Sequence, residues 1–142
     1  MKILHQLIAK DNQQALDFLI LWATYCHEVD DIIDNKINDP EKILRVFVTA
    51  AEVYNHPFYV RYQSYLYSLV IVISNAYADS VKWSHSMVDA QHKMSDVLRH
   101  AGNDMLFAVA FICGGYEHLR TVSSTLREQS WLNHHDDKGN SI

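Results

Sequence analysis

The sequence contains very little of the glycine and proline that tight turns need, with four glycines and two prolines among 142 residues. Hairpin-rich β proteins use these residues freely, whereas long helices joined by short loops need few of them. The scarcity argues against a β fold and favours an all-α protein. Because helices joined by short loops pack as antiparallel neighbours, we expect a compact bundle of about five or six helices.

Basic charge and long apolar runs are also scarce. Lys and Arg total 12 against 17 Asp and Glu, and the formal net charge is -5. Nucleic-acid phosphates need a concentrated positive patch, so we expect no nucleic-acid partner. Neither Met1–Lys10 nor Met105–Cys113 is long enough for a membrane span or a secretory signal, which predicts a cytoplasmic protein. The two cysteines, Cys26 and Cys113, lie in apolar helical patterns and should be reduced and buried.

Capping residues predict where two helices near the start of the chain begin. Asp11 followed by Gln14 has the spacing of a capping box and predicts a helix that continues to about residue 35. Asp39 as the N-cap, with Pro40 at the first helical position, predicts a second helix as far as about Tyr54.

Three further segments complete the predicted bundle. His56-Pro57 interrupts the pattern, and apolar residues from 58 to 76 then recur at the spacing of one long helix. Another long helix is predicted from about Met87 through Cys113, with Gly114-Gly115 marking a bend before residues 116–131. Residues 133–142 lack periodicity, so we expect a single helical domain over residues 1–132 and a flexible C-terminal tail over 133–142.

Acidic side chains crowd the end of the first long predicted helix, at Glu28, Asp30, Asp31 and Asp34. A helix C-terminus already carries partial negative charge, so each unpaired carboxylate there costs roughly 0.3–1 kcal/mol. A hard divalent cation held by oxygen ligands would offset this cost. The pattern therefore predicts that Asp30, Asp31 and Asp34 bind Mg²⁺ or Mn²⁺. The alternative is a helix end that emerges into solvent with hydrated carboxylates.

The direction of the acidic side chains decides between these interpretations. At about 100° per residue, the helical face of Leu16 and Ile20, opposite Phe18 and Trp22, continues into His27, Asp30, Asp31 and Asp34. If the N-terminal half of this helix is buried all round, the carboxylates point into a cleft between helices. His27 or Glu28 is then the predicted general base.

A second polar set shares one face of the later predicted helix. Its members are His92, Asp96, His100, Asn103 and Asp104. Alone, such a set is typical of the solvated face of an amphipathic helix. Because Asp104 adjoins residues 105–113, which are apolar all round, we predict it as a further metal ligand that faces the first helix. The side chains predicted to bind substrate are Asn75, Asp79, Asp96, Arg99, His100 and Asn103.

The acidic run resembles a known metal motif. Asp30-Asp31-Ile32-Ile33-Asp34 is similar to the aspartate-rich DDxxD motif of the isoprenoid synthases, and Asn103-Asp104 is similar to the start of the second metal motif in their terpene cyclase branch. This resemblance implies magnesium ions that hold a substrate diphosphate. Phe107 and Phe111 stand where the second motif has a hydroxyl and a carboxylate.

Two other resemblances concern longer stretches. Glu28 and Asp31 resemble an ExxD pair of the all-α nucleoside triphosphate pyrophosphohydrolases, magnesium-binding helical oligomers, and residues 102–110 are similar to the stretch around their second motif. Over nearly its whole length, through residues 27–34, 55–59 and 114–120, the chain looks most like small uncharacterised helical proteins of marine bacteriophage and metagenomic origin. That resemblance implies the host-cell cytoplasm and no particular activity.

Two functions fit these features. The first is a divalent-metal-dependent hydrolase of a diphosphate-containing small molecule, in which the metal polarises a phosphoryl oxygen and activates water. The second is a non-catalytic helical protein-binding module, such as a phage accessory protein, whose acids serve solubility or steering. The tyrosines of the middle segment predict a homo-oligomer, because they offer more aromatic surface than a small bundle buries. They are Tyr59, Tyr62, Tyr65 and Tyr67.

Overall fold

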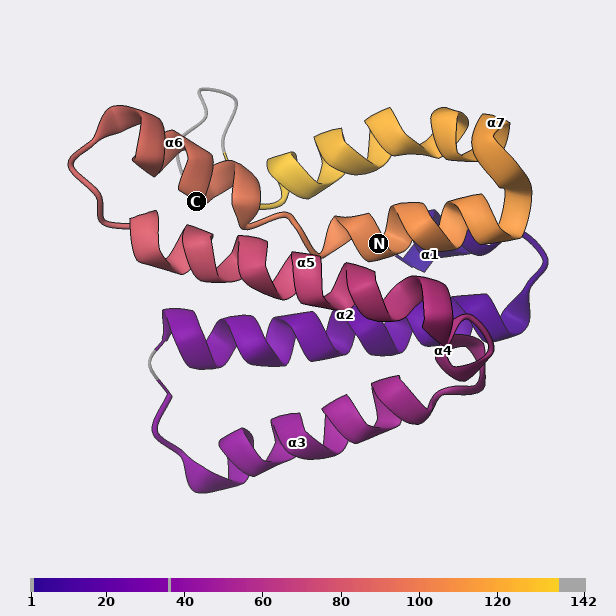
Figure 1. The fold of residues 1–142 in the computed structure, drawn as a ribbon, viewed down its shortest axis with the longest axis horizontal. Helices are drawn as coiled ribbons and strands as arrows, with labels where there is room; N and C mark the ends of the chain where they lie inside the picture. Colours follow the sequence, from indigo (N-terminus) through magenta and orange to yellow (C-terminus); the bar gives the residue numbers. More distant parts are fainter. Residues whose placement is uncertain (1, 36, 136–142) are drawn as a thin grey trace. The chain divides into compact units, whose positions relative to one another are not determined.

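The computed structural model describes residues 2–35 and 37–135, which form seven helices and no strand (Figure 1). The predicted all-α class is confirmed, and the predicted number of five or six helices was too low for the described residues. The helices are α1 (Lys2–Ala9), α2 (Gln13–Asp34), α3 (Pro40–Asn55), α4 (Pro57–Arg61), α5 (Gln63–Trp83), α6 (Asp89–Leu98) and α7 (Asn103–Leu132).

The chain divides between Ser64 and Tyr65 into two compact units. Unit 1 contains α1 to α4, and unit 2 contains α6, α7 and all of α5 beyond its first two residues. The single domain predicted over residues 1–132 stays a prediction, as does the tail over 133–142, of which residues 136–142 lie outside the described residues.

Helix α2 is the centre of unit 1, where it packs on α1, α3 and α4. Its core-facing side chains are buried, and Phe18 stacks on Phe58 of α4 with ring centroids 5.5 Å apart. The N-cap predicted at Asp11 was wrong by one residue. Asn12 caps the helix, because its Oδ1 accepts from the backbone N–H of Ala15 at 3.0 Å, after Lys10 has ended α1 with a φ of 54°.

The predicted start of α3 is confirmed. Asp39 Oδ1 accepts from the N–H of Glu41 at 3.0 Å, and Pro40 occupies the first helical position. His56 ends the helix with extended backbone and caps the next, since its Nδ1 accepts from the N–H of Phe58 at 3.2 Å. The capping nitrogen must be unprotonated, and burial lowers the pKa of His56 in agreement with that.

Two predicted long helices are each divided in the structure. The segment predicted as one helix over 58–76 is broken at Tyr62, whose N–H is shared among carbonyls of α4. The helix predicted from Met87 to Cys113 is broken between Leu98 and Asn103, where residues 99–102 form successive tight turns. An apolar stripe can continue across such breaks, so its spacing did not indicate them.

Helix α7 folds back on itself at Gly115, which has φ 78° and ψ -172°, a conformation that side-chain-bearing residues rarely adopt. The bend predicted at Gly114-Gly115 is therefore confirmed. It separates a first limb, residues 103–114, from a second limb, residues 116–132. Arg127 of the second limb lies with its guanidinium carbon 4.3 Å from the ring centroid of Phe107 in the first, so the limbs contact each other.

Helix α6 is joined to α5 by a reciprocal pair of serines. Ser80 Oγ donates to the carbonyl of Ser95 at 2.8 Å, and Ser95 Oγ donates to the carbonyl of Ser80 at 2.6 Å. Both side chains are buried, and the small residues let the two helices approach closely. Among the described residues, no helix has the length and apolar character needed to cross a membrane.

Candidate functional site

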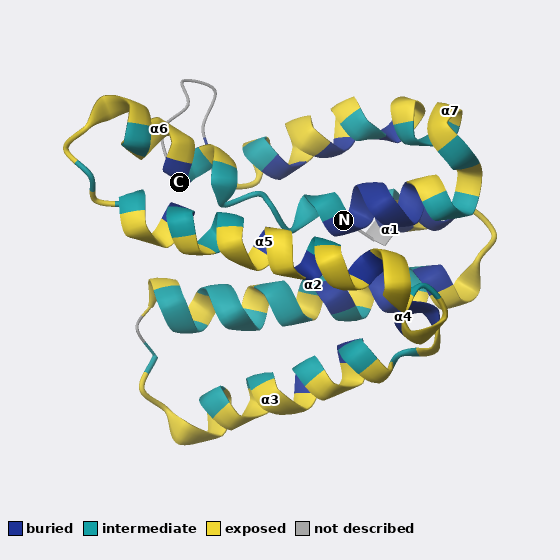
Figure 2. Cartoon of the chain, in the orientation of Figure 1, coloured by how far each residue is buried: buried dark blue, intermediate teal, exposed yellow. Residues whose placement is uncertain are grey.

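The acidic end of α2 is only partly sheltered. His27, Asp31 and Asp34 are exposed, whereas Glu28 and Asp30 are half-buried. The buried face of α2 carries Ala15, Phe18, Leu19 and Trp22 (Figure 2). The acids instead follow the face of Ile20, which is 40 % exposed. The side chains of α2 predicted to bind metal thus continue a face of the helix that solvent reaches.

One oxygen at this end of α2 differs from the others. Oε2 of Glu28 is buried and has no hydrogen-bond partner among the described residues. A buried carboxylate oxygen without a partner carries a desolvation cost, which a cation or a donor would relieve. Within residues 2–35 and 37–135, however, no three His, Cys, Asp or Glu side chains come close enough together to hold a metal ion.

The thiol of Cys26 lies one turn before Asp30 in the same helix. Among the described residues neither Cys26 nor Cys113 forms a disulfide, and both are half-buried rather than fully buried as predicted. Burial, with a smaller effect from the charge of Asp30, raises the pKa of Cys26 to about 12. The thiolate is the reactive form of cysteine, so this burial disfavours Cys26 as a nucleophile.

The side chains predicted to bind substrate are spread in unit 2 over α5, α6, the turns of residues 99–102 and the first residue of α7. Asn75 is exposed on α5, while Asp79 and Asp96 are half-buried on α5 and α6. Arg99 donates from Nε to Ser80 Oγ at 3.3 Å, and its guanidinium lies over the ring of Tyr77. Because α6 ends at Leu98, Asp96 and Asn103 do not share one helical face, and that part of the prediction was wrong.

The structure does bring together two of the predicted residues, His100 and Asn103, through a serine that the sequence did not indicate. Ser130 Oγ lies 2.8 Å from His100 Nδ1 and accepts from Asn103 Nδ2 at 2.8 Å. Ser130 is buried near the end of the second limb of α7. The hydroxyl thus joins the loop that precedes α7 to the end of the same helix.

Two further histidine rings lie beside His100, whose Nδ1 contacts this hydroxyl. His134 and His135 are each within 6.0 Å of the His100 ring, and His135 stacks on Trp131 with centroids 3.6 Å apart. Burial, aided by the charges of His134 and His135, lowers the pKa of His100 to about 4. His100 is therefore neutral at pH 7, and with a buried, unpartnered Nε2 it belongs to a packed polar cluster rather than to an open site.

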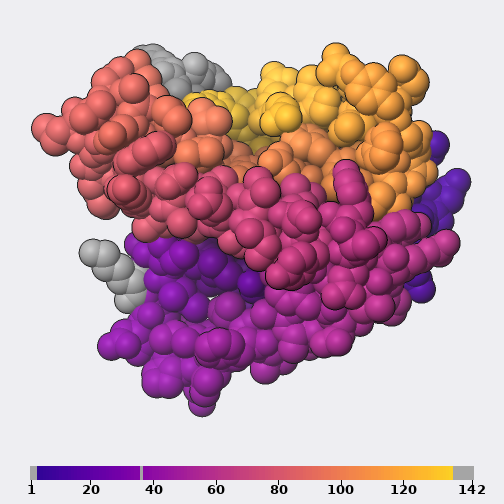
Figure 3. Space-filling view, viewed as in Figure 1, coloured from indigo at the N-terminus to yellow at the C-terminus, as the bar shows by residue number. Residues whose placement is uncertain are grey.

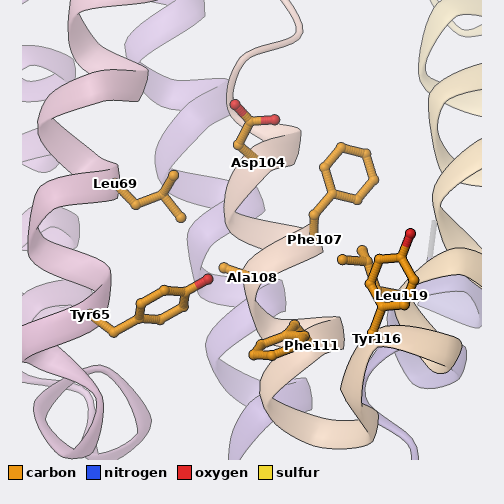
Figure 4. Close-up of a pocket in the computed structure, with 8 residues that line it drawn as sticks. All are labelled: Tyr65, Leu69, Asp104, Phe107, Ala108, Phe111, Tyr116 and Leu119. Atoms are coloured by element: carbon orange, nitrogen blue, oxygen red, sulfur yellow. The ribbon is translucent and has the colours of Figure 1, made fainter.

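Unit 2 contains an open hollow of about 370 Å³ between α5 and the two limbs of α7 (Figure 4). Its lining is mainly aromatic and aliphatic, and only one lining residue is charged. The lining residues are Tyr65, Leu69, Asp104, Phe107, Ala108, Phe111, Tyr116 and Leu119. In the close-up, Asp104 lies at one end of the hollow and Phe111 at the other, with Tyr65 reaching in from α5 (Figure 4).

Asp104 gives the hollow its electrostatic character. Burial raises the pKa of Asp104 above its ordinary value, and the positive charge of Arg127 works against this rise. Arg127 stacks on Phe107 without forming an ion pair with Asp104 within 4.0 Å. The carboxylate is thus partly desolvated beside aromatic rings, an environment that favours a cation with an apolar body.

The sequence drew attention to part of the lining of this hollow. Asp104, Phe107 and Phe111 were all singled out, the first as a ligand and the other two as departures from a metal motif. Tyr116 and Leu119 were missed, although the glycine pair before them was the signal that α7 turns back. A bend at Gly115 places residues on both of its sides against each other.

Comparison with known proteins identifies no relative: no family model, no curated protein and no solved structure matches the chain.

Proposed function

We propose that this chain is a non-catalytic helical protein-binding module, and that the hollow of unit 2 receives an apolar side chain of its partner. The observation that carries this proposal is an aromatic-lined hollow of about 370 Å³ with a single carboxylate at its end. Binding energy at protein interfaces concentrates where aromatic anchors fill such hollows.

The charge of the lining selects the partner's chemistry. A partner residue that fills the hollow must leave a positive group near Asp104, because a like charge would be repelled and a neutral group would leave the carboxylate unpaired. A helical segment with leucine or phenylalanine on one face and lysine beside it satisfies both conditions. We therefore propose a basic amphipathic helix as the bound segment.

Calorimetric titration with a synthetic 16-residue amphipathic peptide tests the proposal. The peptide carries Leu and Phe on one face and Lys on the other, and its counterpart has Glu in place of Lys. We expect the Lys peptide to bind with a Kd of about 10–100 µM, since one anchor site is smaller than a standard interface. Asp104→Asn should weaken binding about five- to tenfold, and Phe111→Ala about tenfold or more.

A matched substitution separates this site from a general effect of charge. Asp89→Asn removes one negative charge from α6, where Asp89 is exposed and paired with Lys93 at 2.8 Å, and it should leave the Kd unchanged. Equal binding of the Lys and Glu peptides, or equal weakening by Asp104→Asn and Asp89→Asn, would refute the proposed docking site.

The metal-dependent hydrolase is a second candidate, and the buried, unpartnered Oε2 of Glu28 is the observation that favours it. In this proposal Asp30, Asp31 and Asp34 hold Mg²⁺ or Mn²⁺, with His27 or Glu28 as the base that activates water.

Titration calorimetry with each metal, before and after Asp31→Ala, tests this candidate. Binding at millimolar or lower concentration that Asp31→Ala weakens at least about tenfold is the expected result, because each carboxylate is a charged ligand. Glu41→Gln, at an exposed acid of α3, is the control. Absence of binding at millimolar metal would contradict the candidate and leave the binding module standing.

A further inference from the structure

The outer face of α3 carries large apolar side chains that solvent reaches. Leu44, Phe47 and Val48 are 60 %, 68 % and 55 % exposed, and Ala51 is exposed beside them. The opposite face of the helix is the one packed into unit 1, where Thr49 and Val53 are buried. Helix α3 is therefore apolar on two sides, of which its own unit covers only one. In the space-filling view, atoms of α3 form part of the surface of unit 1 (Figure 3).

The spacing of these exposed residues is that of a helix-pairing seam. Leu44, Phe47, Val48 and Ala51 lie at positions i, i+3, i+4 and i+7, which form one stripe along a helix. Apolar residues scattered singly on a surface need no explanation, but a continuous stripe on one helix is typical of an interaction surface. The stripe fits another helix laid along it.

Charges beside the stripe favour one particular occupant. Arg45 and Glu52 are seven residues apart, so they lie on the same flank of the stripe, and both are exposed. In an antiparallel pair of identical helices, residues on the same flank face each other, so Arg45 of each copy lies on the side that faces Glu52 of the other. In a parallel pair, each residue lies level with the same residue of the other copy, so neither Arg45 meets a Glu52.

The register of the apolar residues agrees with the register of the charges. A twofold axis between Phe47 and Val48 places Phe47 opposite the second copy's Val48, and Leu44 opposite its Ala51. The same axis leaves Arg45 and the facing Glu52 offset by two residues, about 3 Å along the helix, which these long side chains span. The same antiparallel arrangement therefore pairs the apolar residues of the stripe and brings the opposite charges beside it together.

We propose that the outer face of α3 binds a second copy of this chain through an antiparallel α3–α3 contact. A twofold arrangement uses the same patch on both copies, so the contact closes on itself as a dimer. Helix α3 has 16 residues and is therefore about 24 Å long. A contact of this length falls below the size of a standard interface, so the dimer is weak and reversible, with a Kd of about 10–100 µM.

Sedimentation equilibrium of the full chain over about 5–500 µM tests the dimer. The intact protein should pass from monomer to dimer across this range, and Phe47→Ser should raise the Kd at least about tenfold because it removes the central apolar contact. Leu44→Gln serves as the second variant if circular dichroism shows that Phe47→Ser has lost helix. Lys42→Glu, a charge reversal on α3 outside the stripe, should leave the Kd unchanged.

Charge reversal tests the orientation. Arg45→Glu alone and Glu52→Arg alone should each weaken the dimer about three- to tenfold, because each places like charges opposite each other. The double variant should return to within about threefold of the original Kd. A monomer throughout the range, a dimer indifferent to Phe47→Ser and Leu44→Gln, or a double variant no better than the single ones would each overturn the proposal.

Discussion

Phe18→Ala should lower the free energy of unfolding by about 3–5 kcal/mol, the largest change expected of any single substitution here. Phe18 is fully buried on α2 at the centre of unit 1. Its ring lies 5.5 Å from the ring of Phe58 and 5.7 Å from that of His56, the residue that caps α4. The substitution therefore creates a cavity and removes the surface on which α4 and its cap are packed.

Urea unfolding monitored by circular dichroism measures this change. Ile3→Ala is the matched control, since Ile3 is 83 % exposed on α1 and its truncation should alter the free energy of unfolding by less than about 0.5 kcal/mol. A loss below about 1.5 kcal/mol for Phe18→Ala would show that α2 does not hold unit 1 together through this ring.

Ser130→Ala is expected to cost about 2–4 kcal/mol of unfolding free energy, although only one oxygen atom is removed. That oxygen serves both His100 Nδ1 and Asn103 Nδ2, each at 2.8 Å. A buried or half-buried polar group that loses its partner costs about 1–3 kcal/mol, and here two groups lose the same partner. The hydroxyl therefore has more effect on stability than its size suggests.

Two variants define the origin of this cost. Ser124→Ala, at an exposed position of the same helix, should change the free energy of unfolding by no more than about 0.5 kcal/mol. Because Ser130 and Asn103 share one hydrogen bond, Asn103→Ala combined with Ser130→Ala should cost less than the sum of the two single substitutions. Strict additivity would mean that the cluster does not act as a unit.

Capping residues in the sequence correctly predicted where α3 begins, whereas two helix breaks without such residues were missed. Asp39 and Pro40 begin α3 as expected, because a side-chain cap and a fixed proline φ act within one turn of the chain. The breaks at Tyr62 and between Leu98 and Asn103 were missed, since neither contains proline and the apolar spacing continues across both. Their turns are held by backbone hydrogen bonds that composition does not reveal.

For the candidate sites too, the sequence predicted local features but not which elements pack together. The glycine pair predicted the fold-back of α7, and with it the opposition of its two limbs, but not that α5 supplies Tyr65 and Leu69 to the hollow. The acidic run of α2 was visible in the sequence, whereas its direction was not. Both sides of α2 are apolar in pattern, and only packing shows that the side of Phe18 is the buried one.

A methyl nuclear magnetic resonance titration of the intact chain with the Lys peptide tests whether the hollow receives the partner's side chain. Docking into the hollow predicts progressive shifts of the methyl signals of Leu69, Ala108 and Leu119, which line it. The methyl signals of Ile3 and Leu7, exposed on α1, should stay in place. Binding that moves the α1 methyl groups and leaves Leu69, Ala108 and Leu119 unchanged would contradict the claim that the hollow receives the partner.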